Sequence, residues 1–197
     1  MNRTTCLVCT VLLIATFARA GVPTDQIRKT TDEILKVVQE HRGDEDDVVE
    51  KRRGAIREIV GHRFDWESMA QRSLGRHWRS GNEAQKSEFV DLFSQLLEDT
   101  YMEKVEGYSG EEVVYENERK DGEYARVFVK ILNNTGKEIS VEYRVKNNGG
   151  NWLVYDVVIE GVSLVKNYRS QFNSLMARGD FNEMLEKLRK KIEKLEL

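Results

Sequence analysis

The sequence predicts an α+β fold, because helical patterns at both ends of the chain flank a run of four strands. Up to Val105 and again from Ser163, apolar residues recur every three or four positions, which is typical of helices that cover another layer. Between these regions, alternating segments are separated by Asp121-Gly122, residues 133–136 and residues 147–150. Turn residues of this kind favour hairpins, so we expect an antiparallel meander.

Four helices are expected before the strands, each with an apolar stripe and with residues that favour a helix end. Pro23 opens the first helix, and the acidic residues 44–47 precede the second, where the helix dipole favours negative charge. Asp65 is a candidate N-cap of a short third helix, and the fourth begins at Ser80 or Asn82. The stripe of this longest helix contains Phe89, Leu92, Phe93, Leu96, Leu97, Tyr101 and Val105.

The strands are expected at residues 113–118, 124–132, 139–145 and 152–159. The third alternates apolar with polar residues, which indicates one buried face, whereas the fourth is apolar on both faces. Strict alternation in the fourth strand places Trp152, Val154 and Val158 on one face, and Leu153, Tyr155, Val157 and Ile159 on the other. One of these faces belongs to the core, so the other requires a further protein layer or a ligand.

Two helices are expected after the strands, the first from Ser163 to Arg178 and the second from Asp180. The second is amphipathic, and the face opposite its apolar stripe is basic. That face contains Lys187, Arg189, Lys190, Lys191 and Lys194. We favour packing of this helix on the rest of the domain, with docking to a partner or to lipid head groups as the alternative.

The first twenty residues have the pattern of a cleaved export signal. A basic start is followed by an apolar run over residues 7–18 and by a small-residue cleavage site that ends at Ala20. The run is shorter than the roughly 20 residues of a membrane-spanning helix, so an uncleaved anchor is the less favoured alternative. We therefore expect export, cleavage after Ala20, and a single domain over residues 21–197. Cys6 and Cys9 lie in the removed segment, so the mature chain is expected to contain no disulfide.

Charge and motif content argue against several function classes. Without the first twenty residues the chain carries 29 basic and 34 acidic residues, and this acidic balance disfavours nucleic-acid binding. His41, His62 and His77 stand in separate segments without zinc-ligand spacing, so we expect no metal site. Asp156 is the one candidate acid or base, and a small enzyme that uses it in an apolar pocket is an alternative function. Pairing of Asp156 with an arginine or a helix terminus is the simpler interpretation, so we expect no catalytic residue.

Two ordered blocks of residues, together spanning positions 63–172, carry a family resemblance. The first block contains Arg63-Phe64-Asp65, Met69-Ala70, Leu74-Gly75, Trp78, Phe89, Phe93, Leu97 and Tyr101. The second contains Tyr155-Asp156-Val157, Glu160-Gly161-Val162-Ser163-Leu164-Val165, Asn167-Tyr168-Arg169 and Phe172. In this order they resemble the signature of the MlaC family of periplasmic phospholipid-binding proteins, also described as toluene-tolerance or ABC-transporter auxiliary components.

The resemblance implies a strongly curved sheet of four main strands whose concave side is covered by helices, with acyl chains held in an apolar cleft between the layers. It implies a periplasmic carrier that exchanges phospholipid with an outer-membrane lipoprotein complex and with an inner-membrane ABC transporter that bears a substrate-binding subunit. Such a carrier helps to maintain the lipid asymmetry of the outer membrane. The other alternative is an adaptor or chaperone module with a filled core and no lipid.

The resemblance also implies lipid-binding positions, with phospholipid as the ligand and no other cofactor. The matching signature residues are Phe93, Leu97, Tyr101, Tyr155, Val157, Ile159, Leu164, Tyr168 and Phe172. Strand alternation adds Val127, Val129, Val141 and Tyr143 to the expected lipid-binding set. Arg169 is the candidate head-group contact, with a surface ion pair as its alternative role. The physical requirement behind these predictions is an apolar space, large enough for an acyl chain, between sheet and helices.

Overall fold

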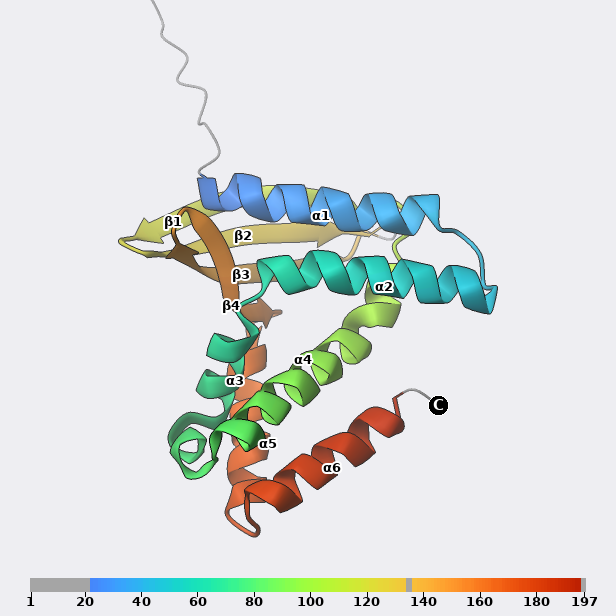
Figure 1. Ribbon diagram of the computed structural model, residues 1–197. Helices are drawn as coiled ribbons and strands as arrows, with labels where there is room; N and C mark the ends of the chain where they lie inside the picture. Colours follow the sequence, from blue (N-terminus) through green and yellow to red (C-terminus); the bar gives the residue numbers. More distant parts are fainter. Residues whose placement is uncertain (1–21, 134–135, 196–197) are drawn as a thin grey trace, which may run out of the picture.

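The computed structural model describes residues 22–133 and 136–195, so the expected export signal and its two cysteines lie outside the described residues. The described chain is an α+β fold in which helices precede and follow an antiparallel sheet (Figure 1). Its elements are α1 (Val22–Glu40), α2 (Asp46–Arg63), α3 (Trp66–Leu74), η1 (Gly75–Ser80), α4 (Glu83–Glu106), β1 (Glu112–Asp121), β2 (Tyr124–Leu132), β3 (Glu138–Asn148), β4 (Asn151–Ile159), β5 (Val162–Ser163), α5 (Leu164–Met176) and α6 (Phe181–Glu193).

The sheet has the order β1-β2-β3-β4-β5, so each strand pairs with the next one along the chain. This confirms the predicted meander, and it adds one short strand that the sequence did not indicate. The chain reverses at Glu160 and Gly161, which have φ angles of 50° and 78°. The reversal allows Val162 and Ser163 to pair with the end of β4.

The predicted faces of β4 are wrong beyond its middle, because the strand contains a β-bulge. Arg144 of β3 pairs with Asp156, but the next residue, Val145, pairs with Val154, so Tyr155 is the extra residue. A bulge shifts the alternation by one position. Val154 and Val157 therefore face the same side of the sheet, although strict alternation would have separated them.

The helix starts depend on side-chain caps that the sequence largely indicated. Asp65 accepts a hydrogen bond from the Ser68 amide at 2.9 Å, as expected for the N-cap of α3. Asn82, rather than Ser80, caps α4 and forms a reciprocal capping box with Gln85. Ser163 accepts from the Lys166 amide at 3.1 Å and so begins α5 directly after β5.

The helices form two groups around the sheet. In Figure 1, α1 and α2 lie along one side of the sheet, whereas α3, α4, α5 and α6 extend below it. The lower group is closely packed around aromatic rings, with Phe93 5.3 Å from Tyr168 and 5.6 Å from Phe172 between ring centroids. The apolar side of α6 is buried in this group, which confirms that the helix packs on the fold.

Candidate ligand cavity

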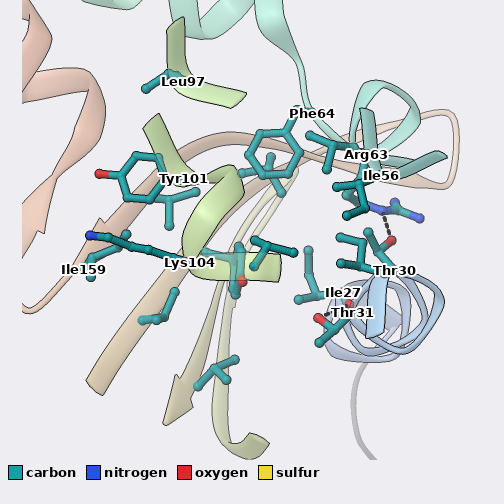
Figure 2. Close-up of a pocket in the computed structure, with 18 of the residues that line it drawn as sticks. Ile27, Thr30, Thr31, Ile56, Arg63, Phe64, Leu97, Tyr101, Lys104 and Ile159 are labelled. Carbon is teal, nitrogen blue, oxygen red and sulfur yellow. Dashed lines mark hydrogen bonds between the residues drawn. The ribbon is translucent and has the colours of Figure 1, made fainter. Parts of the chain in front are cut away.

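A cavity of about 520 Å³ lies between the sheet, α1, α2 and the C-terminal half of α4 (Figure 2). Ligand sites of small molecules span about 300–1,000 Å³, so the volume is that of a binding site rather than of a packing defect. In the described part of the chain no helix combines the length and apolar character that a membrane span requires.

The cavity wall is mainly apolar and comes from every layer of the fold. The sheet contributes Val113, Val129, Ile131, Ile139, Val141, Tyr143, Val154, Val157 and Ile159. The helices and the segments next to them contribute Ile27, Ile34, Leu35, Ile56, Val60, Phe64, Trp66, Met69, Leu97, Tyr101, Met102, Val105, Tyr108 and Leu164. A wall of this composition suits a hydrocarbon ligand, because moving apolar surface out of water is the main favourable contribution to the free energy of binding.

This space stays open because the residues on the inner face of the sheet are small. Val129, Val141 and Val157 are short β-branched side chains on three neighbouring strands, and they project little from the sheet. Phe89 and Phe93 on the N-terminal half of α4 are instead fully buried against aromatic rings of α5 and α6. The void therefore begins where the aromatic packing of α4 ends, close to Leu97.

Eight of the thirteen expected lipid-binding residues lie in the cavity wall. They are Leu97, Tyr101, Val129, Val141, Tyr143, Val157, Ile159 and Leu164. The structure brings these residues together from α4, α5 and three strands. Their predicted contact with lipid stays a prediction, and what the structure shows is that they line one cavity.

The other five expected residues lie elsewhere. Phe93 and Val127 have no exposed surface and belong to the packed core. Tyr168 and Phe172 join Phe93 in the aromatic cluster below the cavity. Tyr155, the bulge residue, contacts Tyr124 and Arg72 outside the cavity wall. These residues lie outside the wall because of the way the helices pack on the sheet, which the apolar pattern of the sequence does not predict.

Arg169, the expected head-group contact, also lies outside the cavity wall. Its guanidinium packs so closely against Gly75 that any larger residue there would collide with it, since a Cβ at this position would lie 2.5 Å from Nη2. Gly75 has a φ of 55°, a backbone conformation that favours glycine, whereas the guanidinium is the end of a flexible side chain and can move aside. The arginine thus contacts the junction of α3 and η1.

Helices α1 and α2 also line the cavity, although none of their residues was expected at the site from the sequence. Ile27, Ile34 and Leu35 of α1 and Ile56 and Val60 of α2 line the cavity, although their spacing indicates only a helix face turned inward. An apolar stripe looks the same whether it contacts protein or a void. The weak burial of α2, whose buried residues are Arg52 and Ile56, is a structural sign that its apolar face meets a space.

Asp156 has a structural role at the start of α5. Its carboxylate accepts hydrogen bonds from Ser163 Oγ at 2.7 Å, from the Val165 amide at 3.1 Å and from Arg144 Nη1 at 3.1 Å. This is the pairing with an arginine and a helix terminus that the sequence suggested. The residue does not line the cavity, so it is not placed to act on a molecule bound there.

Ion pairs join α2 to α4 beside the cavity. Glu106 accepts from Arg52 Nε at 2.9 Å and from Arg53 Nη2 at 2.8 Å. Burial raises the pKa of Glu106, but hydrogen bonds from Arg53 and Arg52 outweigh this effect, so the net pKa is lowered. Further along the helices, Arg57 lies 3.6 Å from Glu98 and 3.0 Å from Asp99.

Burial raises the pKa of two polar side chains in the wall. Burial raises the pKa of the Glu98 carboxyl to about 7, the effect of Asp99 adds to it, and Arg57 opposes it. Burial raises the pKa of Tyr143 to about 12, so its hydroxyl stays neutral at any physiological pH. Arg63 donates to the Thr30 hydroxyl at 2.9 Å (Figure 2), and to the Gln26 side chain and the Trp152 carbonyl at 2.8 Å.

Among the residues that the structure describes, no group of three or more histidine, cysteine, aspartate or glutamate side chains could hold a metal ion. Of the charged wall residues, Arg57 pairs with Glu98, Arg63 is hydrogen-bonded to neighbouring side chains and a backbone carbonyl, and Glu111 accepts hydrogen bonds from Ser109. The site offers a large apolar surface and few polar groups, a composition suited to binding a molecule with hydrocarbon chains.

The chain is similar to a family of known proteins. The family model described as MlaC protein matches residues 28–190. The toluene tolerance protein ttg2D of Pseudomonas putida is 25% identical over 174 residues, which cover 85% of this chain and 81% of the relative. The intermembrane phospholipid transport system binding protein MlaC of Haemophilus influenzae is 24% identical over 120 residues, covering 58% of this chain and 56% of the relative.

A solved structure has the same fold. It is that of the phospholipid-binding protein from Ralstonia solanacearum in complex with a phospholipid, with a TM-score of 0.79. The likeness covers 89% of this chain and 99% of that one, at 24% sequence identity. The arrangement of sheet and helices is thus shared over nearly the whole of the described chain.

Proposed function

Because the chain belongs to the MlaC family, we propose that it binds a phospholipid in its cavity and carries it between membranes. The observation that carries this proposal is the apolar cavity of about 520 Å³ between sheet and helices. The named relatives, a phospholipid transport system binding protein and a phospholipid-binding protein, support the choice of ligand.

The energetics of such a cavity suit a carrier. Each methylene moved out of water contributes about 0.8 kcal/mol, so acyl chains do not leave the cavity for the aqueous phase. Transfer from a bilayer into the cavity replaces hydrocarbon by hydrocarbon and is nearly neutral for the tails. A carrier with few polar contacts can therefore hold its lipid across an aqueous gap and still release it at a membrane.

The finer proposal is a periplasmic shuttle. We infer that the chain is exported by its N-terminal segment and exchanges phospholipid with an outer-membrane lipoprotein complex and an inner-membrane ABC transporter with its substrate-binding subunit. The family membership supports this assignment. The cavity argues against an adaptor with a filled core, and the position of Asp156 argues against an enzyme that uses this residue.

Lipid analysis tests the proposal directly. The full chain is expressed with its N-terminal segment in a Gram-negative host, purified from the periplasm without detergent, and extracted with organic solvent. We expect about one phospholipid per chain by mass spectrometry. An extract without stoichiometric lipid, from protein that is folded by circular dichroism, would contradict the carrier function.

A cavity-filling variant locates the lipid. Val157→Trp places an indole in the wall, and we expect lipid occupancy to fall at least about fivefold, equivalent to about 1 kcal/mol. The fold should remain, because the indole enters a void rather than a packed core. Val162→Trp is the matched control, since Val162 is 56% exposed and lies outside the wall. Equal occupancy in the two variants would place the lipid elsewhere.

A further inference from the structure

The rim of the cavity is marked by two exposed side chains. Of the residues that line the wall, Arg57 and Lys104 are exposed, whereas the others are buried or half-buried. A residue that belongs both to the wall and to the surface lies where the cavity meets solvent. The polar end of a ligand with apolar chains inside the cavity can therefore reach these two cations.

The two cations differ in how their charge is compensated. Arg57 lies within 4 Å of both Glu98 and Asp99, so its positive charge is already matched. Lys104 has no carboxylate within ion-pair distance among the described residues. Its Nζ instead lies 5.4 Å from the centre of the Tyr101 ring, a cation–π contact that leaves its three N–H donors available.

The remaining charged wall residues have other partners. Arg63 is held by Thr30, Gln26 and the Trp152 carbonyl. The Glu111 carboxylate accepts from the amide and hydroxyl of Ser109 within its own turn. The uncompensated positive charge at the rim is thus that of Lys104, within the part of the chain that the structure describes.

The polar groups of Lys104 and Tyr101 lie together. Figure 2 shows both side chains on one side of the cavity, with the ammonium nitrogen and the phenol oxygen directed the same way, next to Ile159. Burial raises the pKa of Tyr101, so its hydroxyl remains a neutral donor. An ammonium and a hydroxyl at the end of an apolar cavity form a recognition pattern for a phosphate attached to hydrocarbon.

We propose that Lys104, assisted by the Tyr101 hydroxyl, binds the phosphate of a lipid whose acyl chains occupy the cavity. This inference rests on the proposed function and adds to it the residue that selects a phosphorylated lipid over a neutral one. It replaces Arg169 in that role, because Arg169 packs against Gly75 outside the wall. Lys104 is a point charge on a flexible chain, so it favours the phosphate without fixing the group beyond it.

A competition between two lipids tests the assignment. Delipidated protein is incubated with mixed vesicles of phosphatidylglycerol and a diacylglycerol with the same two acyl chains, and bound lipids are counted by mass spectrometry. We expect Lys104→Gln to lower the ratio of bound phosphatidylglycerol to bound diacylglycerol about tenfold, as for loss of one hydrogen bond to a charged group. Lys104→Arg should restore most of this ratio.

The matched control is Lys146→Gln. Lys146 also lies over an aromatic ring, 5.9 Å from the centre of Tyr124, but it is outside the cavity wall. The variant removes the same charge and the same kind of ring contact, and we expect the wild-type lipid ratio. An equal change in the two variants would mean that overall charge, rather than the rim site, determines the ratio, and would overturn the assignment.

The other outcomes separate this inference from the proposed function. A wild-type protein that binds neither lipid would overturn both. Wild-type loading with an unchanged ratio in Lys104→Gln, or with equal loss of both lipids, would overturn only the role of Lys104.

A competition with excess inorganic phosphate distinguishes a lipid phosphate from a free one. The added phosphate should not displace phosphatidylglycerol. Displacement in the wild type but not in Lys104→Gln would indicate a free-phosphate site instead.

Discussion

Glu98 is a carboxyl in an apolar wall, and its surroundings oppose its ionisation. Its side chain is 14% exposed, and Arg57 is shared with Asp99 at 3.0 Å. Burial therefore raises its pKa from the ordinary 4.5 to about 7, and Asp99 adds to the shift. The folded state binds this proton more tightly than the unfolded state, so Glu98 lowers stability progressively as pH rises from about 4.5 to about 7.

Replacement of Glu98 tests this linkage. We expect Glu98→Gln to be more stable than the wild type at pH 8 by about 1–3 kcal/mol, with the difference shrinking below about pH 5. Urea unfolding at the two pH values measures it. A variant that is less stable at pH 8 would mean that the ion pair with Arg57 outweighs burial.

A comparison of Val127 with Val129 explains why the candidate site was only partly predictable from the sequence. Val129 and Val127 differ by two positions on one strand and have the same side chain, yet Val129 lines the cavity and Val127 is packed in the core. Alternation correctly places both on the inner face. Which part of that face is packed and which borders the cavity depends on how the helices are placed over the sheet, and alternation carries no information about that.

At the scale of elements, α2 is the helix held most by polar contacts. Arg52 and Arg53 both reach Glu106 on α4, whose side chain is 12% exposed, and Arg52 also donates to the carbonyls of His41 and Gly43. The apolar contacts beside them form a small cluster of Val38, Ile56 and Met102. The ion pairs therefore supply much of the attachment between two walls of the cavity.

Removing Glu106 should loosen this attachment. We expect Glu106→Gln to lower the free energy of unfolding by about 2–4 kcal/mol, because it leaves the charge of the nearly buried Arg52 without its carboxylate partner. The control is Asp47→Asn, which removes an exposed i,i+4 pair with Lys51 and should cost less than about 0.5 kcal/mol. Equal stabilities in urea unfolding would show that packing, and not the ion pair, joins α2 to α4.

The stability from Glu106 should also depend on pH in a defined direction. Its folded pKa is lowered by Arg53 and Arg52, so its contribution is present above the unfolded pKa of about 4.5 and is lost as pH falls through the folded value. Glu98 acts in the opposite sense between about 4.5 and 7. The two carboxyls on one helix thus favour maximal stability on the acidic side of neutrality.

At the scale of the whole molecule, the cavity provides room for a ligand but lowers the stability of the folded protein. Side chains around a void lack contacts on one side, which destabilises the protein relative to a filled core. A bound ligand restores those contacts and stabilises the folded state by mass action. The mature chain is expected to have no disulfide to compensate, so the empty form depends on the aromatic core below the cavity.

Removal of lipid should therefore lower the thermal stability. At a free lipid concentration of about 100 times Kd, the ligand contributes about 2.7 kcal/mol, so we expect Tm to fall by about 5–10 °C on delipidation. Differential scanning calorimetry of the two forms measures the shift, and adding phosphatidylglycerol vesicles should reverse it. In Val157→Trp the shift should be smaller, because the indole already occupies part of the void. An identical Tm in both forms of the wild type would argue against a lipid in the cavity.

The sequence by itself determined the α+β class, the helix starts at Asp65 and Ser163, and the meander, because these depend on local hydrogen bonds and on apolar periodicity. It narrowed the start of α4 to Ser80 or Asn82, and the structure selects Asn82. It also determined that the inner sheet face is apolar. The tertiary structure decided the rest: the bulge at Tyr155 that turns Val157 inward, the boundary between packed core and cavity, and the place of Lys104 at the rim. These features depend on how helices cross the sheet, and a void has no residues of its own to leave a pattern in the sequence.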